Sequence, residues 1–140
     1  MPHFRIIDED AEEIQMCFER ARVHIRSAYR RRDEGKDYHA IATMYDALEY
    51  GLRWYLLKIQ PDNPSDDRFF ITKAFSHADL PSSLIERVVE IMDNLMDLDE
   101  EVVNPEIVAE FFEISERVLT HLELYPFNFS VLPDEFPGIY

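Results

Sequence analysis

The stretch DYHAIATMYDALEYGLRWYLLKIQ, residues 37–60, decides the fold because it is apolar along two helical stripes. A helix that is apolar on two sides is buried between neighbours, and small residues let one neighbour approach closely. We therefore expect this stretch to be the central helix of a bundle. One stripe alternates spacings of three and four, and the other is made mostly of small residues. They consist of Tyr38, Ile41, Tyr45, Leu48, Leu52, Tyr55 and Ile59, and of Ala40, Met44, Ala47, Gly51 and Trp54.

The aromatic residues of this helix have two interpretations. Tyr38, Tyr45 and Tyr55 are the kind of side chain on which nucleic-acid bases stack. Their helical spacing instead places them on the apolar stripe, so we predict that they lie in the core. Tyr50 lies off both stripes, and we expect it to be partly exposed.

Helical periodicity and helix-end signals extend this pattern along the chain. Gly35 follows a basic last turn, which predicts the end of the first helix. Asn104 followed by Pro105 predicts the start of the last helix, because asparagine caps and proline suits the first position. The fold class that we predict is all-α, a five-helix up-and-down bundle in one domain. Its helices span about residues 9–34, 37–60, 68–78, 82–98 and 105–124.

The C-terminal segment, residues 125–140, has the sequence YPFNFSVLPDEFPGIY and should not be helical. Its three prolines disfavour a helix, but its rings and aliphatic side chains make free disorder unfavourable. We expect an extended tail that packs on the chain's own bundle. Packing across a second subunit is the alternative.

Length, charge and cysteine count indicate which classes of protein are compatible with the sequence. A chain of 140 residues with 46% hydrophobic residues and a formal charge of -15 is expected to form one core and to repel general nucleic acid. The single cysteine, Cys17, excludes an intrachain disulfide. No secretory signal or membrane-spanning run is evident, so we expect a cytoplasmic protein. The five histidines show no i, i+4 pair, and we expect neither a metal nor another cofactor.

The region from Ala11 to Lys58 resembles the first helical hairpin of the HEPN superfamily. The similarity includes a small–apolar–acidic step at Ala47–Glu49, the turn SHADL at residues 76–80, and a last helix that contains EISERVLTHL at residues 113–122. This resemblance implies a four- to five-helix bundle that is often dimeric. Many members are ribonucleases with an arginine four to six residues before a histidine, and others bind partners such as minimal nucleotidyltransferases.

The expected ribonuclease motif is not in its usual place. Arg117 and His121 are separated by three residues, and Arg32 and His39 by six but in the first turn. An arginine that holds a phosphate and a histidine that acts as a general base would suffice for RNA cleavage. We nevertheless expect no catalytic residues, and keep a metal-independent, toxin-like ribonuclease that uses Arg32 and His39 as the alternative.

A basic stripe near the first turn is the predicted anion-binding site. Arginines four apart share one helical face and can grip phosphates. Pairing of these arginines with the acidic later helices is the other interpretation. The predicted site consists of Arg22, Arg26, Arg30, Arg31, Arg32 and His39.

These observations favour a non-catalytic interaction or ligand-binding protein that forms a homodimer. By the resemblance, its partner is a nucleotidyltransferase, or its ligand is a nucleotide or RNA. A third hypothesis is an acidic structural adaptor that binds a basic protein.

Overall fold

The computed structural model describes residues 13–59, 80–96 and 103–132, and these form four α-helices and no strand. The prediction of an all-α protein is therefore confirmed for the described residues. The helix predicted at residues 68–78 lies outside them, so the count of five stays a prediction. The elements are α1 (Glu13–Asp33), α2 (Asp37–Ile59), α4 (Ser82–Met96), α5 (Pro105–His121) and the 3-10 turn η3 (Phe129–Val131).

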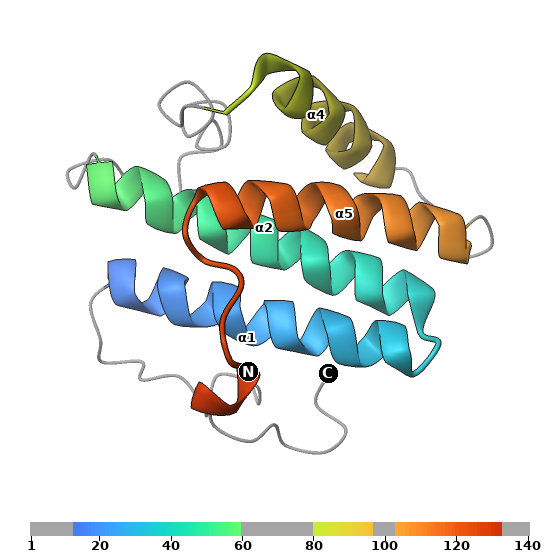
Figure 1. Ribbon diagram of the computed structural model, residues 1–140, viewed down its shortest axis with the longest axis horizontal. Coiled ribbons are helices and arrows are strands. Elements are labelled where there is room, and N and C mark those ends of the chain that lie inside the picture. The colour runs from blue at the N-terminus through green and yellow to red at the C-terminus, as the bar shows by residue number, and fades with distance from the viewer. Residues whose placement is uncertain (1–12, 60–79, 97–102, 133–140) are drawn as a thin grey trace.

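Helix α2 lies between α1 and α5, as its two apolar stripes predict (Figure 1). Helices α1 and α2 form an antiparallel hairpin, and α5 runs beside α2 in the same direction. Helix α4 packs on α5 and runs antiparallel to it. Of the described helices, none is long and apolar enough to span a membrane.

The turn between α1 and α2 is built on Gly35. Its φ of 77° is left-handed, a conformation that glycine adopts without steric cost. The amide of Gly35 bonds the carbonyl of Arg32 at 3.0 Å, and the amide of Lys36 bonds that of Arg31 at 2.9 Å. This is the Schellman pattern that satisfies the last carbonyls of a helix. The predicted stop signal is confirmed.

The small-residue stripe of α2 lets α5 approach closely. Ala40, Met44 and Ala47 are fully buried, and Gly51 faces the end of α5. A Cβ on Gly51 would lie 3.1 Å from Cδ2 of Leu119. The glycine thus makes room for neighbouring side chains, as close packing at this position predicts.

The other stripe of α2 is less buried than its spacing predicts. Tyr38 is 37% exposed, because it lies in the first turn of α2 at one end of the hairpin. Tyr45 and Tyr55 are half-buried and pack against the core, and Tyr50 is partly exposed, as expected. The prediction that Tyr38 lies in the core is wrong.

Helix α5 begins as predicted and ends earlier. The side chain of Asn104 accepts a hydrogen bond from the amide of Ile107 at 3.0 Å, with Pro105 at the first position. The helix ends at His121, before the expected boundary at Leu124. Glu123 there has a φ of 65°, and the amide of Leu124 bonds the carbonyl of Leu119 at 2.9 Å. A second Schellman end turns the chain away from the helix axis.

The described part of the tail, residues 125–132, crosses from the end of α5 onto α1 (Figure 1). Tyr125, Phe127 and Phe129 pack against the core cluster. The segment is not fully extended, because η3 forms one turn whose Asn128 side chain accepts from the amide of Ser130 at 3.0 Å. This part of the tail therefore lies on the chain's own bundle.

Candidate functional site

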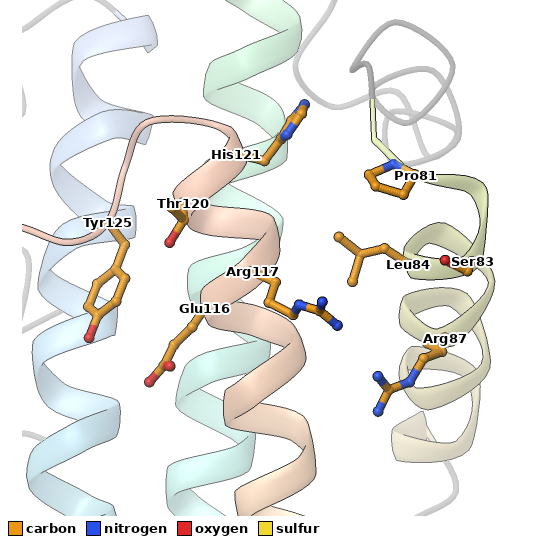
Figure 2. Close-up of a pocket in the computed structure, with 9 residues that line it drawn as sticks. All are labelled: Pro81, Ser83, Leu84, Arg87, Glu116, Arg117, Thr120, His121 and Tyr125. Carbon is orange, nitrogen blue, oxygen red and sulfur yellow. The ribbon is translucent and has the colours of Figure 1, made fainter.

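A groove of about 570 Å³ lies between α4 and α5, within the usual size range of small-molecule sites. The N-terminal half of α4 forms one wall, and the C-terminal half of α5 and the first tail residue form the other (Figure 2). Antiparallel packing of α4 on α5 brings these two helix ends together. The described lining consists of Pro81, Ser83, Leu84, Arg87, Glu116, Arg117, Thr120, His121 and Tyr125.

Two arginines from facing helices project into the groove. Figure 2 shows the guanidinium of Arg117 directed toward α4 and that of Arg87 directed toward α5. Arg87 makes an ion pair with Glu110 at 3.7 Å, in which both side chains are about half exposed. Such pairs contribute under about 1 kcal/mol, so an incoming anion can compete for Arg87. Among the described residues, Arg117 has no ion-pair or hydrogen-bond partner.

The carboxylate in the described lining belongs to Glu116, and it is turned away from these arginines (Figure 2). The hydroxyl of Tyr29 on α1 donates a hydrogen bond to Glu116. Burial raises the pKa of the Glu116 carboxyl. Glu116, the carboxylate in the described lining, is thus held by Tyr29 and is not paired with Arg87 or Arg117.

Hydroxyl and ring groups complete the polar side of the groove. Ser83 is one turn before Arg87, and His121 is one turn after Arg117, so each pair shares a helical face. Thr120 adds a second hydroxyl. No hydrogen bond joins His121 to either hydroxyl within the described part of the chain. The described residues of the groove therefore offer hydrogen-bond donors to an anion.

Two arginines of the basic stripe predicted from the sequence, Arg22 and Arg26, lie on α1 and contact the tail. Arg22 lies between two rings, with its guanidinium carbon 4.5 Å from the centroid of Phe18 and 4.4 Å from that of Phe127. Arg26 donates to the carbonyl of Phe129 at 3.4 Å and to that of Leu132 at 3.3 Å. Both arginines thus bind the tail. The sequence had suggested anion binding or pairing with the acidic later helices, and neither interpretation included this contact.

The other three arginines of the predicted site have separate contacts. Arg30 pairs with Glu34 at 3.2 Å, one helical turn further along α1. Arg31 donates to the hydroxyl of Thr43 on α2 at 3.1 Å. Arg32 lies over the rings of Tyr29 and Phe112, at 4.7 and 5.0 Å from their centroids, and 3.7 Å from Asp33. None of these five arginines is among the described residues that line the α4/α5 groove.

Arg32 and His39 are not brought together as a pair. His39 lies in the first turn of α2 and contacts the ring of Tyr38 edge to face, at 5.7 Å between centroids. It lines a second hollow of about 330 Å³ with Tyr38, Val103 and the first-turn residues Gly35, Lys36 and Asp37. Arg32 is not among the described residues of that hollow.

Sequence reasoning did not select the groove, although the signal was present. Arg117 and His121 were noted only as a departure from a ribonuclease spacing. Their i, i+4 relation, and that of Ser83 with Arg87, places each pair on one face of an amphipathic helix. What was missing is that the two faces meet, which depends on how α4 packs against α5.

Within the described residues, no group of three His, Cys, Asp or Glu side chains is arranged to hold a metal ion.

Comparison with models of known protein families, with curated proteins and with solved structures found no match. The resemblance to the HEPN superfamily therefore stays a prediction from sequence pattern.

Proposed function

We propose that this chain is a non-catalytic protein that binds a small phosphate-bearing ligand, such as a nucleotide, in the groove between α4 and α5. The observation that carries the proposal is the convergence of Arg87 and Arg117 from facing helices, with Glu116 held elsewhere. Guanidinium groups recognise phosphate oxygens through paired, charge-assisted hydrogen bonds. The hydroxyl of Ser83, one turn before Arg87, supplies a further donor.

Charge favours a small ligand over a polynucleotide. The formal charge of the chain is -15, and Glu86, Glu90, Glu110 and Glu113 are exposed on the two helices that form the groove. A long polyanion would meet these carboxylates outside the groove, whereas a compact phosphate can bind at the two guanidiniums without extending over the exposed carboxylates. The apolar groups of Pro81 and Leu84, and the ring of Tyr125, leave surface for the body of the ligand.

Binding of ATP and of inorganic pyrophosphate, measured by isothermal titration calorimetry at low ionic strength, tests the proposal. Loss of one charged hydrogen-bonding group costs about 1.5–3 kcal/mol, so Arg117→Ala should weaken binding by about tenfold or more. Lys36→Ala is the matched control, because it also removes one positive charge but from a residue whose described partner is Glu34 at 3.0 Å. Added salt should weaken binding to the wild type.

Equal affinities of the wild type and Arg117→Ala would contradict the proposal. A pyrophosphate affinity equal to that of ATP would show that the groove recognises phosphate alone. The homodimer and the nucleotidyltransferase partner that the resemblance implies stay predictions beside this proposal.

A further inference from the structure

Tyr125 belongs both to the groove and to the tail. Its side chain is part of the groove wall, next to Glu116 and Thr120 (Figure 2). It is also the first ring of the segment that crosses from α5 onto α1. A ligand that fills the groove therefore contacts the residue at which the tail begins.

Tyr29 links the groove wall to the rest of the tail. Its hydroxyl donates to Glu116 and lies 3.3 Å from the hydroxyl of Tyr125. Its ring stacks on that of Tyr125, with centroids 6.0 Å apart and planes 12° apart, and contacts Phe129 at 5.7 Å. Burial, followed by the charge of Glu116, raises the pKa of Tyr125. Glu116, Tyr125 and Phe129 thus share one partner on α1.

Beyond this cluster the tail is held by contacts that are local to α1. Arg26 bonds two carbonyls of the tail, and Arg22 lies against the ring of Phe127. Neither arginine is part of the described groove lining. The docking of the tail can therefore be weakened by substitutions that leave the groove residues unchanged.

We propose that the segment of residues 125–132 is a strap whose docking on α1 is coupled to occupancy of the α4/α5 groove. The inference rests on the proposed function, because it concerns the regulation of the same site. The docked strap fixes Tyr125 as a groove wall, so it raises the affinity for the ligand. By linkage, the bound ligand stabilises docking of the strap by the same factor, and typical couplings are about fivefold or more.

The first test follows the tail in the wild-type chain. Amide hydrogen exchange of residues 127–132 is measured with and without saturating ATP, which serves as the probe. The inference predicts that exchange at these amides slows by about fivefold. ATP that binds without changing their exchange would overturn the inference and leave the proposed function intact. Absence of ATP binding would overturn both.

The second test reverses the direction of the coupling. Arg26→Ala removes the bonds to the tail from the α1 side, and Phe127→Ala removes the ring that Arg22 contacts from the tail side. Each variant should bind ATP about fivefold more weakly, with Lys36→Ala unchanged. Unchanged affinity in either variant, with faster tail exchange, would contradict the coupling. If a variant fails to fold, the wild-type exchange experiment decides.

Discussion

Gly51 of α2 faces Leu124 so closely that a Cβ on the glycine would lie 2.9 Å from Cδ1 of the leucine. Leu124 is fully buried and follows the end of α5. This contact ties the centre of the bundle to the point at which the chain leaves α5 for the tail. Because Leu124 is enclosed, it has little room to move away from an added methyl group.

Gly51→Ala is therefore expected to lower the free energy of unfolding by about 1 kcal/mol. Overpacking costs about 1–3 kcal/mol, and the gain in helix propensity offsets about 1 kcal/mol of it. Urea unfolding followed by circular dichroism measures the change. The double variant Gly51→Ala, Leu124→Ala is the control, since the effect of the alanine at position 51 should become smaller or favourable there. A more stable single variant would show that α5 yields at this contact.

The left-handed residues that end α1 and α5, Gly35 and Glu123, predict opposite changes in stability when the first is replaced by alanine and the second by glycine. Glu123 has a φ of 65° without being glycine, which costs about 1 kcal/mol. Glu123→Gly should raise the free energy of unfolding by about 0.5–1 kcal/mol, and Gly35→Ala, at a φ of 77°, should lower it by about 1 kcal/mol. Thermal and urea unfolding of both variants test the pair. Changes of the same sign would argue against the left-handed assignment of one of these ends.

His24 predicts how stability depends on pH. Its Nδ1 donates to the carbonyl of Arg20 at 2.7 Å, and burial lowers the pKa of the imidazole below its usual 6.5. The unfolded chain therefore binds a proton near pH 6.5 that the folded chain does not bind. The free energy of unfolding should fall as the pH drops below 6.5, because the unfolded state takes up more protons.

The matched variant for this prediction is His24→Asn, which keeps an N–H donor and does not titrate. Burial raises the pKa values of the Asp46 and Glu49 carboxyls, and these groups act in the opposite direction. The difference between wild type and variant isolates His24. Urea unfolding at several pH values from 7.5 to 5 should show a smaller loss in the variant, and parallel curves would contradict the assignment.

The ribonuclease alternative has its own direct test. Arg32 lies over aromatic rings and His39 lies in a separate hollow, so we expect no metal-independent cleavage when the chain is incubated with RNA in a chelator. Gel analysis with wild type and His39→Ala provides the measurement. Cleavage by the wild type that disappears in His39→Ala would support the alternative and argue against a non-catalytic protein.

The sequence predicted those parts of the fold that depend on local signals. Gly35, Asn104 and Pro105 mark helix ends by their own backbone and capping chemistry, and the small residues around Gly51 mark a close contact. The end of α5 was predicted too late, at residue 124, because Glu123 adopts the left-handed conformation that is usually marked in a sequence by glycine. The burial of Tyr38 was predicted wrongly because helical periodicity does not show where the bundle ends.

The candidate site depended on contacts between distant segments, which periodicity alone does not supply. The sequence placed Arg22 and Arg26 on one face of α1, but their partners are rings and carbonyls about a hundred residues later. Arg87 and Arg117 likewise lie on different helices, and the sequence of either helix alone does not indicate a binding site. They become a candidate site only when the packing of α4 on α5 directs both toward one groove.

The most direct measurement of the central claim is a titration of the ¹⁵N-labelled full chain with ATP, followed by nuclear magnetic resonance. Binding in the groove predicts the largest shifts at the amides of Ser83, Arg87, Arg117 and His121 and at the side-chain Nε–H signals of the two arginines. Shifts confined to Arg30, Arg31 and His39, or no saturable shift at all, would contradict binding in the α4/α5 groove.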